Sequence, residues 1–232
     1  MRGETFAPGD RIRAIVLEVR KDGPRVRIIV SRTHPDLVRR LFELEVPEIA
    51  DNIIEIKRVV REPGYRTKMA VISADPKIDC IGACVGVRGS RIKAVIDELR
   101  GERIDIIRWS DSLEQLVMNG LKPASIQLDN IYANVDNHSV VVVVDEDQQS
   151  LAIGKKGQNV RLASRLCGWD IDIKTRDEFE TEGFEPAEGS PSASAAAAPE
   201  GEASSEEGSD ESEAPTAAAH SRVAPAPPSS SG

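Results

Sequence analysis

Two copies of one short pattern constrain what this chain can fold into more than any other feature of its sequence. The first copy is VGVRG at residues 85–89, and the second is IGKKG at residues 153–157. In each copy an apolar residue precedes a Gly-x-x-Gly turn, and an amphipathic stretch follows it. A repeat that agrees this far predicts two small units of one fold within the 232 residues.

The stretch after each turn has the period of a helix. Apolar residues lie at positions 92, 95, 96 and 99 after the first turn, and at 160, 163 and 167 after the second. Gly101 and Gly168 then lie where a left-handed residue closes a helix, because glycine takes positive φ without steric cost. Residues 104–106 and 171–173 alternate as half-buried strands do, so each unit continues from turn to helix to strand.

The two turns have the chemistry of a phosphate site. A bend with glycine at both ends lets the backbone of another molecule approach, and the helix that follows points amide N–H groups at that place. Arg88, Lys155 and Lys156 lie between the glycines and add positive charge there. A single turn of this kind is more often structural, but two matched turns before helices favour binding.

Each turn, with its flanking helix and strand, resembles the loop of a KH domain, which holds four nucleotides of single-stranded RNA. The resemblance implies an α+β fold of tandem type II KH domains. The residues predicted to bind RNA are Gly86, Val87, Arg88, Gly89, Ser90, Arg91, Lys93, Gly154, Lys155, Lys156, Gly157, Gln158, Asn159 and Arg161. The polar residues among them that lie on the helix N-termini are equally compatible with solvated surface.

Residues 9–31 read as a β-hairpin. Apolar residues at 12, 14, 16, 26, 28 and 30 alternate with arginines at 11, 13, 25 and 27, and a turn is predicted at 21–24. One face of the hairpin is therefore basic. Such a face suits RNA, and it equally suits an ordinary solvated sheet face.

Longer runs resemble the NusA family of bacterial transcription termination and antitermination proteins. PGDRIRA at 8–14 and VSRTHP at 30–35 are similar to the closing half of that family's OB-type domain. RGERIDI at 100–106 and SLAIGKKGQN at 150–159 are similar to its KH domains. The resemblance covers residues 8–176 and implies RNA binding in transcription elongation, pausing, termination and antitermination.

The same resemblance implies the partners. Single-stranded RNA of the nascent transcript is the expected ligand, and RNA polymerase and elongation-complex factors are the expected protein partners. The earlier strands of an OB barrel, which has about five, and the N-terminal region by which the family docks on polymerase have no counterpart in the sequence. We therefore expect a fragment or a late start, and the resemblance leaves direct polymerase contact by this chain open.

The predicted domains follow from the order of the patterns. They are a partial OB-type RNA-binding domain, a hairpin or barrel remnant, at 1–34, a first KH domain with its connecting helix at 35–120, a second KH domain at 121–177, and a disordered acidic Ala/Ser/Pro/Glu tail at 178–232. Helices are expected at 35–44, 113–121 and 148–153, and strands at 54–59, 68–72, 125–133 and 140–144. Because the joint at Lys122-Pro123 is short, we expect closely packed units whose two loops together hold about eight to twelve nucleotides.

Negative charge is concentrated in the tail. Residues 178–232 hold twelve acidic residues and one basic residue, whereas residues 1–177 carry a net charge of about +2. From residue 185 the chain is Ala, Ser, Pro, Gly and Glu without an apolar period, which predicts a disordered acidic tail. Such a tail could keep RNA from wrong sites, contact basic partners or only aid solubility.

No pattern points to catalysis, a metal or a cofactor. Cys80 and Cys84 lie four residues apart, but no further Cys or His pair is near in sequence to complete a zinc site, so buried thiols are favoured. No Ser-His-Asp, HExxH or P-loop pattern occurs. We therefore expect no enzyme and no catalytic residue.

Location and oligomeric state complete the expectations. No window of about 18 apolar residues occurs, and the N-terminus lacks the apolar stretch of a secretory signal. We expect a cytoplasmic monomer without membrane contact. Two other functions stay open, which are an RNA-decay or ribosome-assembly role for the tandem KH units and a protein scaffold on a degenerate KH surface. The intact glycines and the Lys155-Lys156 pair argue against the scaffold.

Overall fold

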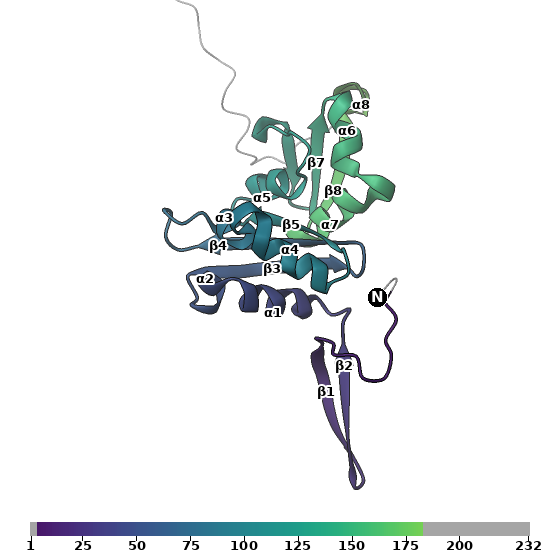
Figure 1. Ribbon diagram of the computed structural model, residues 1–232. Coiled ribbons are helices and arrows are strands. Elements are labelled where there is room, and N and C mark those ends of the chain that lie inside the picture. The colour runs from purple at the N-terminus through teal and green to yellow at the C-terminus, as the bar shows by residue number, and fades with distance from the viewer. Residues whose placement is uncertain (1–3, 183–232) are drawn as a thin grey trace, which may run out of the picture. The chain divides into compact units, whose positions relative to one another are not determined.

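The computed structural model describes residues 4–182, which form a hairpin and two units of mixed helices and strands (Figure 1). The hairpin consists of β1 (Ile15–Asp22) and β2 (Arg25–Ser31). The first unit consists of α1 (Pro35–Glu45), α2 (Pro47–Ala50), β3 (Ile54–Glu62), β4 (Arg66–Ser73), α3 (Cys80–Val85), η1 (Val87–Gly89), α4 (Ser90–Glu98) and β5 (Arg103–Arg108). The second consists of α5 (Leu113–Gly120), η2 (Leu128–Asn130), β6 (Ile131–Asn134), β7 (Ser139–Val144), α6 (Glu146–Ile153), η3 (Lys155–Gly157), α7 (Gln158–Cys167), β8 (Asp170–Thr175) and α8 (Arg176–Glu182).

Both units repeat the order that the sequence predicts, which is helix, hairpin, helix, turn, helix and strand. Their sheets have the orders β3-β4-β5 and β6-β7-β8. In each sheet the first pair of strands is antiparallel and the second pair is parallel. The predicted α+β fold of tandem KH-type units is therefore confirmed.

The core of the first unit lies between its sheet and helices α1 and α4. Pro35 stands in the first turn of α1, and His34 Nδ1 accepts the amide N–H of Asp36 at 3.2 Å, so the helix begins where its first donors are satisfied. The apolar residues of α1 are buried together with residues of α4 and strand β4. This core includes Leu37, Val38, Leu41, Phe42, Val46, Ile54, Met69, Val71, Val95 and Leu99.

A buried carboxylate fixes the turn between β3 and β4. Glu102 is 0% exposed, and it accepts hydrogen bonds from Arg61 Nε at 2.8 Å and Arg61 Nη2 at 2.9 Å. The backbone N–H of Gly64 donates to the same carboxylate at 2.7 Å, and the hydroxyl of Thr67 donates at 2.6 Å. Because a buried carboxylate is costly without such partners, this network holds the turn in one conformation.

Helix α7 joins the two units. One side of it packs on the second core, where Ala163 lies with Val140 and Val142. On its other side Leu166 is buried against Ala70 of β4 and Ile107 of β5. Strand β4 is consequently buried along most of its length, because helices cover both faces of its sheet. The predicted close packing of the two units agrees with these contacts.

The N-terminal hairpin has the predicted strands and turn. Val16 pairs with Val30 and Val19 pairs with Ile28, which places these four side chains on one face. All four are at least half exposed, so this apolar face lacks a cover among residues 4–182. Arg32 ties the end of the hairpin to α4 through Glu98, whose carboxylate lies 2.9 Å from Nη1. The assignment of residues 1–34 to an OB-type domain stays a prediction.

Three sequence expectations need correction. The strand predicted at 125–133 is shorter, because residues 128–130 form a 3-10 turn and β6 begins only at Ile131. Instead of a boundary between residues 120 and 121, packing favours one near residue 112, since α5 contributes Val117 to the second core. Residues 178–182, which the sequence predicts as part of the tail, belong to α8, where Phe179 stacks on Tyr132 with ring centroids 4.8 Å apart. The remaining tail lies outside the described residues.

Candidate nucleic-acid interface

The two Gly-x-x-Gly turns have one backbone conformation. Gly86 and Gly154 end α3 and α6 with φ/ψ of 76°/172° and 73°/174°. Gly89 and Gly157 begin α4 and α7 with φ/ψ of 76°/17° and 68°/16°. All four glycines have positive φ, which explains why the repeat keeps glycine at both ends of the turn.

The two glycines of each turn have different surroundings. At the first glycine a Cβ atom would lie 2.7 Å from the side chain five residues ahead, which is Arg91 in the first unit and Asn159 in the second. At Gly89 the nearest such atom is 3.9 Å away, and at Gly157 nothing lies within 4 Å. The first glycine therefore permits tight internal packing, and the second leaves open space in front of a helix N-terminus.

Positive charge lies beside both open glycines. Arg88, Lys155 and Lys156 are exposed, and none of them forms an ion pair or a side-chain hydrogen bond within residues 4–182. Helices α4 and α7 begin without a side-chain cap, so their first amide groups are not satisfied by a neighbouring side chain. The N–H groups of Ser90 and Gln158 donate to the backbone oxygens of Val87 and Lys155 within each turn. A helix N-terminus without a side-chain cap, with free cations beside it, nevertheless suits a phosphate oxygen.

Three further predicted residues lie on the outside of the first turn. Val87 is 83% exposed, which is unusual for an apolar side chain and leaves it available to a ligand. Ser90 and Lys93 are exposed on the first turns of α4. Their predicted contact with RNA remains a prediction, and their position is compatible with it.

Arg91 and Asn159 point inward instead. Arg91 Nη1 donates to the backbone oxygen of Ala83 at 2.6 Å and lies 2.9 Å from the carboxylate of Glu48. Asn159 is 0% exposed, and its Nδ2, with two hydrogens, lies within hydrogen-bond distance of three backbone oxygens, the nearest of which is that of Leu121 at 2.9 Å. The expectation that Asn159 contacts RNA is therefore corrected, because its amide is used to hold α5 and α6 against α7.

Gln158 and Arg161 are engaged by the first unit. Glu62, at the end of β3, accepts a hydrogen bond from Gln158 Nε2 and another from Arg161 Nε, both at 2.7 Å. The Arg161 guanidinium at this position lowers the pKa of the Glu62 carboxyl below its usual value. These two residues thus join the units at the second turn, and any contact they make with RNA would add to that role.

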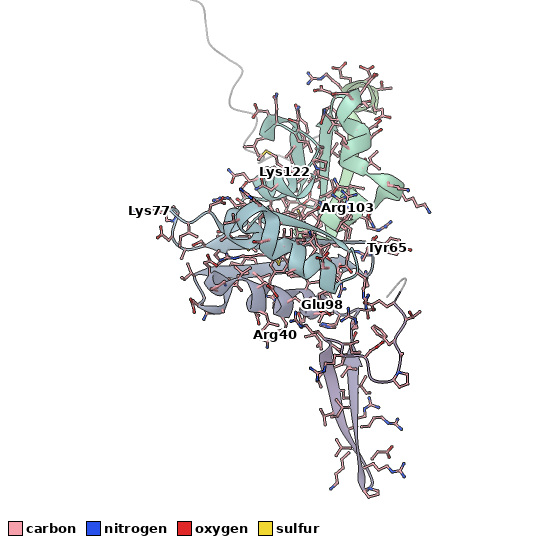
Figure 2. The ribbon with its side chains drawn as sticks, viewed as in Figure 1. Arg40, Tyr65, Lys77, Glu98, Arg103 and Lys122 are labelled. Atoms are coloured by element: carbon pink, nitrogen blue, oxygen red, sulfur yellow. The ribbon has the colours of Figure 1, made fainter. Side chains whose placement is uncertain are left out.

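Tyr65 was missed by the sequence analysis as a candidate. It follows Glu62 on the β3–β4 turn (Figure 2), and with Glu62 it lines a cavity whose other walls are Lys155, Lys156, Gln158 and Arg161. These residues are about ninety positions apart in the chain, so no local pattern indicated that they meet. The contact follows from the packing of α7 on the first sheet.

Family comparisons decide what these units are. Residues 32–109 match the NusA-like first KH domain, and residues 113–181 match the NusA-like second KH domain. Together the two ranges make up more than half of the chain. The chain belongs to the NusA family.

Two curated relatives of this NusA-type chain carry the name "Transcription termination/antitermination protein NusA". The relative from Rickettsia conorii is 50% identical over 179 residues, which make up 77% of this chain and 36% of the relative. The relative from Bacillus subtilis is 46% identical over 188 residues, which make up 81% of this chain and 50% of the relative. The chain thus spans half or less of the length of these relatives.

The cysteines of this NusA-type chain lie in apolar surroundings. Burial raises the pKa of the Cys84 thiol to about 12 and also raises that of Cys167 to about 12. Thiols of this kind are protonated at neutral pH, whereas a metal ligand must be a thiolate. Among residues 4–182 no three His, Cys, Asp or Glu side chains are grouped as metal ligands would be.

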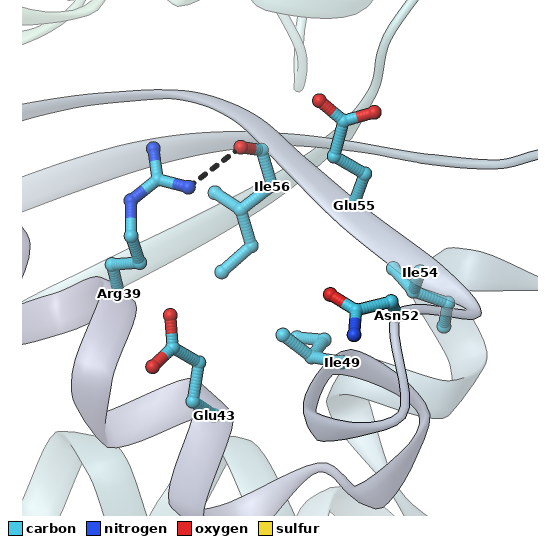
Figure 3. Close-up of a pocket in the computed structure, with 7 residues that line it drawn as sticks. All are labelled: Arg39, Glu43, Ile49, Asn52, Ile54, Glu55 and Ile56. Atoms are coloured by element: carbon cyan, nitrogen blue, oxygen red, sulfur yellow. Dashed lines mark hydrogen bonds between the residues drawn. The ribbon is translucent and has the colours of Figure 1, made fainter.

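A second cavity of about 300 Å³ lies beside α1, α2 and β3 (Figure 3). Its walls are Arg39, Glu43, Ile49, Asn52, Ile54, Glu55 and Ile56. None of the residues predicted to bind RNA lines it, and Arg39 Nη1 already donates to the backbone oxygen of Ile56 at 2.7 Å. We assign no ligand to this cavity.

None of the helices within residues 4–182 is long and apolar enough to span a membrane.

Proposed function

We propose that this chain binds single-stranded RNA through its two KH turns and acts as an RNA-binding factor in transcription elongation, pausing, termination and antitermination. The observation that carries the proposal is the matched pair of turns, each with an open glycine in front of an uncapped helix. Exposed cations at Arg88, Lys155 and Lys156 lie beside them. This combination suits the sugar–phosphate backbone of a strand whose bases stay available for reading.

The name that both relatives carry supports the transcription role over an RNA-decay or ribosome-assembly role. On this proposal the ligand is the nascent transcript, bound in the cytoplasm by a monomer that carries no enzymatic activity. The family resemblance implies RNA polymerase and elongation-complex factors as partners. Of these partners, RNA is the one whose binding is supported by the geometry of the described residues.

The two turns are proposed to act on one RNA strand. Leu166, Arg58 and Glu62 hold α7 on the first sheet, so binding at one turn keeps the second turn close to the same strand. The second binding step then has an effective concentration in the millimolar range, roughly as for short linkers. An RNA of about eight to twelve nucleotides is expected to reach both turns.

The test places a negative charge at each open glycine. Gly89→Asp and Gly157→Asp bring a carboxylate to the position proposed for a phosphate, so each variant should bind an RNA of about twelve nucleotides at least about tenfold more weakly. The double variant should lose binding in a fluorescence anisotropy titration. Unchanged affinity in the double variant would refute the proposal and favour the protein scaffold.

Gly23→Asp is the matched control. Gly23 has φ of 61°, nothing lies within 4 Å of a Cβ there, and it belongs to the hairpin turn. The substitution therefore adds the same charge at a similar φ outside the KH turns. Its affinity for the RNA should equal that of the natural chain within about twofold, since one distant charge is screened by salt. Circular dichroism melting of all variants checks that they fold.

A further inference from the structure

The cavity beside the second turn is formed by both units. It has a volume of about 550 Å³ and is lined by Glu62, Tyr65, Lys155, Lys156, Gln158 and Arg161. A volume of this size is within the range of sites that hold small organic groups, roughly 300–1,000 Å³. Lys155 and Lys156 of the turn itself line the cavity, so a strand bound at the turn would lie beside it.

The aromatic wall of the cavity is held rigidly. Tyr65 is 49% exposed, yet its backbone N–H donates to Glu62 O at 3.0 Å and its carbonyl accepts from the Arg103 N–H at 3.1 Å. The preceding residue, Gly64, is fixed by the buried carboxylate of Glu102 at 2.7 Å. A ring presented to solvent on a fixed turn loses little further entropy when a flat group stacks on it.

Other residues that line the cavity carry positive charge. Glu62 is the one acidic residue lining the cavity, and its two carboxylate oxygens already accept from Gln158 and Arg161 at 2.7 Å. Lys155 and Lys156 have no such partner within the described part of the chain. The cavity therefore combines an aromatic face with two ammonium groups that are available to an anion.

We propose that this cavity binds one nucleotide of the RNA strand held by the second turn. Its phosphate lies on Lys155 and Lys156, and its base stacks on the ring of Tyr65. Stacking of this kind accepts any base, because every base has a π face. The inference rests on the proposed function, and it adds to that function a base-stacking residue that the first unit supplies to the site of the second.

The experiment uses the full chain, an RNA of about twelve uridines labelled with fluorescein, and three substitutions of Tyr65 and its neighbours. Tyr65→Ala should weaken binding about tenfold, and Tyr65→Phe should bind within about twofold of the natural chain because it keeps the ring. The dependence of affinity on salt should be unchanged in Tyr65→Ala. In Lys156→Gln the slope of log affinity against log salt should fall by about one, since a phosphate contact is lost.

A second measurement locates the base directly. The same RNA with 4-thiouridine should crosslink on irradiation to residues 62–65 of the natural chain, as read by peptide mass spectrometry. Equal affinity of Tyr65→Ala and the natural chain would overturn this inference, while loss of binding in the Gly89→Asp and Gly157→Asp double variant would still uphold the proposed function. A loss in Tyr65→Phe as large as in Tyr65→Ala would also overturn it, because stacking does not need the hydroxyl.

Discussion

The two glycines of the second turn have different roles, because Gly154 packs against Asn159 and Gly157 leaves open space. An alanine at Gly154 would place its Cβ 2.7 Å from that of Asn159 at a φ of 73°, whereas an alanine at Gly157 would meet nothing within 4 Å at a φ of 68°. We predict that Gly157→Ala costs about 1 kcal/mol for the left-handed backbone alone. Gly154→Ala should cost about 2 kcal/mol more, because overpacking is added. Urea denaturation measures both, and equal costs would contradict the assignment.

Asn159 should affect stability and Lys156 should affect binding. Asn159→Ala removes a buried amide that is hydrogen-bonded to the backbone oxygens of Leu121 and Ala152, so it should lower the free energy of unfolding by about 1–3 kcal/mol. Lys156→Ala should leave stability within about 0.5 kcal/mol, since its side chain is exposed, and should weaken RNA binding. The two quantities are measured by urea denaturation and anisotropy titration. A stable Asn159→Ala variant that has lost RNA affinity would reverse these roles.

The sequence was informative for residues whose role is set locally. Positive φ at Gly86, Gly89, Gly154 and Gly157 follows from the turn pattern alone. It was less informative for the residues that begin the helix after the second turn. Gln158 and Arg161 contact Glu62, and Asn159 is buried, because α5 and the first sheet both pack on this helix. Such contacts depend on tertiary packing, which the period of a helix does not encode.

Helix α7 is the element on which both units depend. Its periodic apolar face is predicted from residues 160, 163 and 167, and Leu162 and Leu166 lie beside that face in the sequence. In the structure both leucines are 0% exposed. A helix that is apolar on more than one side is buried on more than one side, so the additional leucines were the signal of a second packing surface.

Leu166→Ala tests the packing of α7 on the first sheet. Leu166 is buried against Ala70 and Ile107, so truncation should lower the free energy of unfolding by about 2–4 kcal/mol. Leu151→Ala is the control, because Leu151 is 45% exposed and its truncation should cost less than about 1 kcal/mol. Thermal and urea unfolding give both values. Equal destabilisation by the two substitutions would contradict the burial of Leu166 between the units.

The contact between Glu62 and Arg161 should make the packing of the two units sensitive to acid. The Arg161 guanidinium lowers the pKa of Glu62 below 4.5, so the folded carboxyl binds its proton less readily than the unfolded one. The contribution of the ionised Glu62 carboxyl to the free energy of unfolding is therefore present above about pH 4.5 and is lost as the pH falls through the pKa of the folded state. Glu62→Gln should be less stable at neutral pH by at most about 1 kcal/mol, as for partly exposed ion pairs.

The stability difference between the natural chain and Glu62→Gln should then shrink as the pH is lowered. Urea midpoints measured from neutral pH down past 4.5 would show the two curves converging. Parallel curves throughout would mean that the Glu62 carboxylate contributes nothing to the joint. Interdomain nuclear Overhauser contacts to Arg161 provide an independent check of the same joint.

For the whole molecule, the order of elements and the repeat were predictable from the sequence, and the surface that joins the units was not. The short connection at Lys122-Pro123 indicated close neighbours, but many faces can meet across so short a joint. Two hydrogen bonds fix which faces meet: Arg58 donates to the carbonyl of Leu166, and Arg161 donates to the carboxylate of Glu62. The nucleic-acid interface consequently includes residues of the first unit at the turn of the second.

The dependence of binding affinity on RNA length tests most directly whether both turns hold one strand. We predict that affinity for uridine oligomers rises steeply between about four nucleotides, which fill one turn, and about eight to twelve, which reach both. In Gly89→Asp or Gly157→Asp that rise should disappear, because a single turn remains. An affinity that is the same for short and long RNA, or a rise that survives the loss of either turn, would contradict the account.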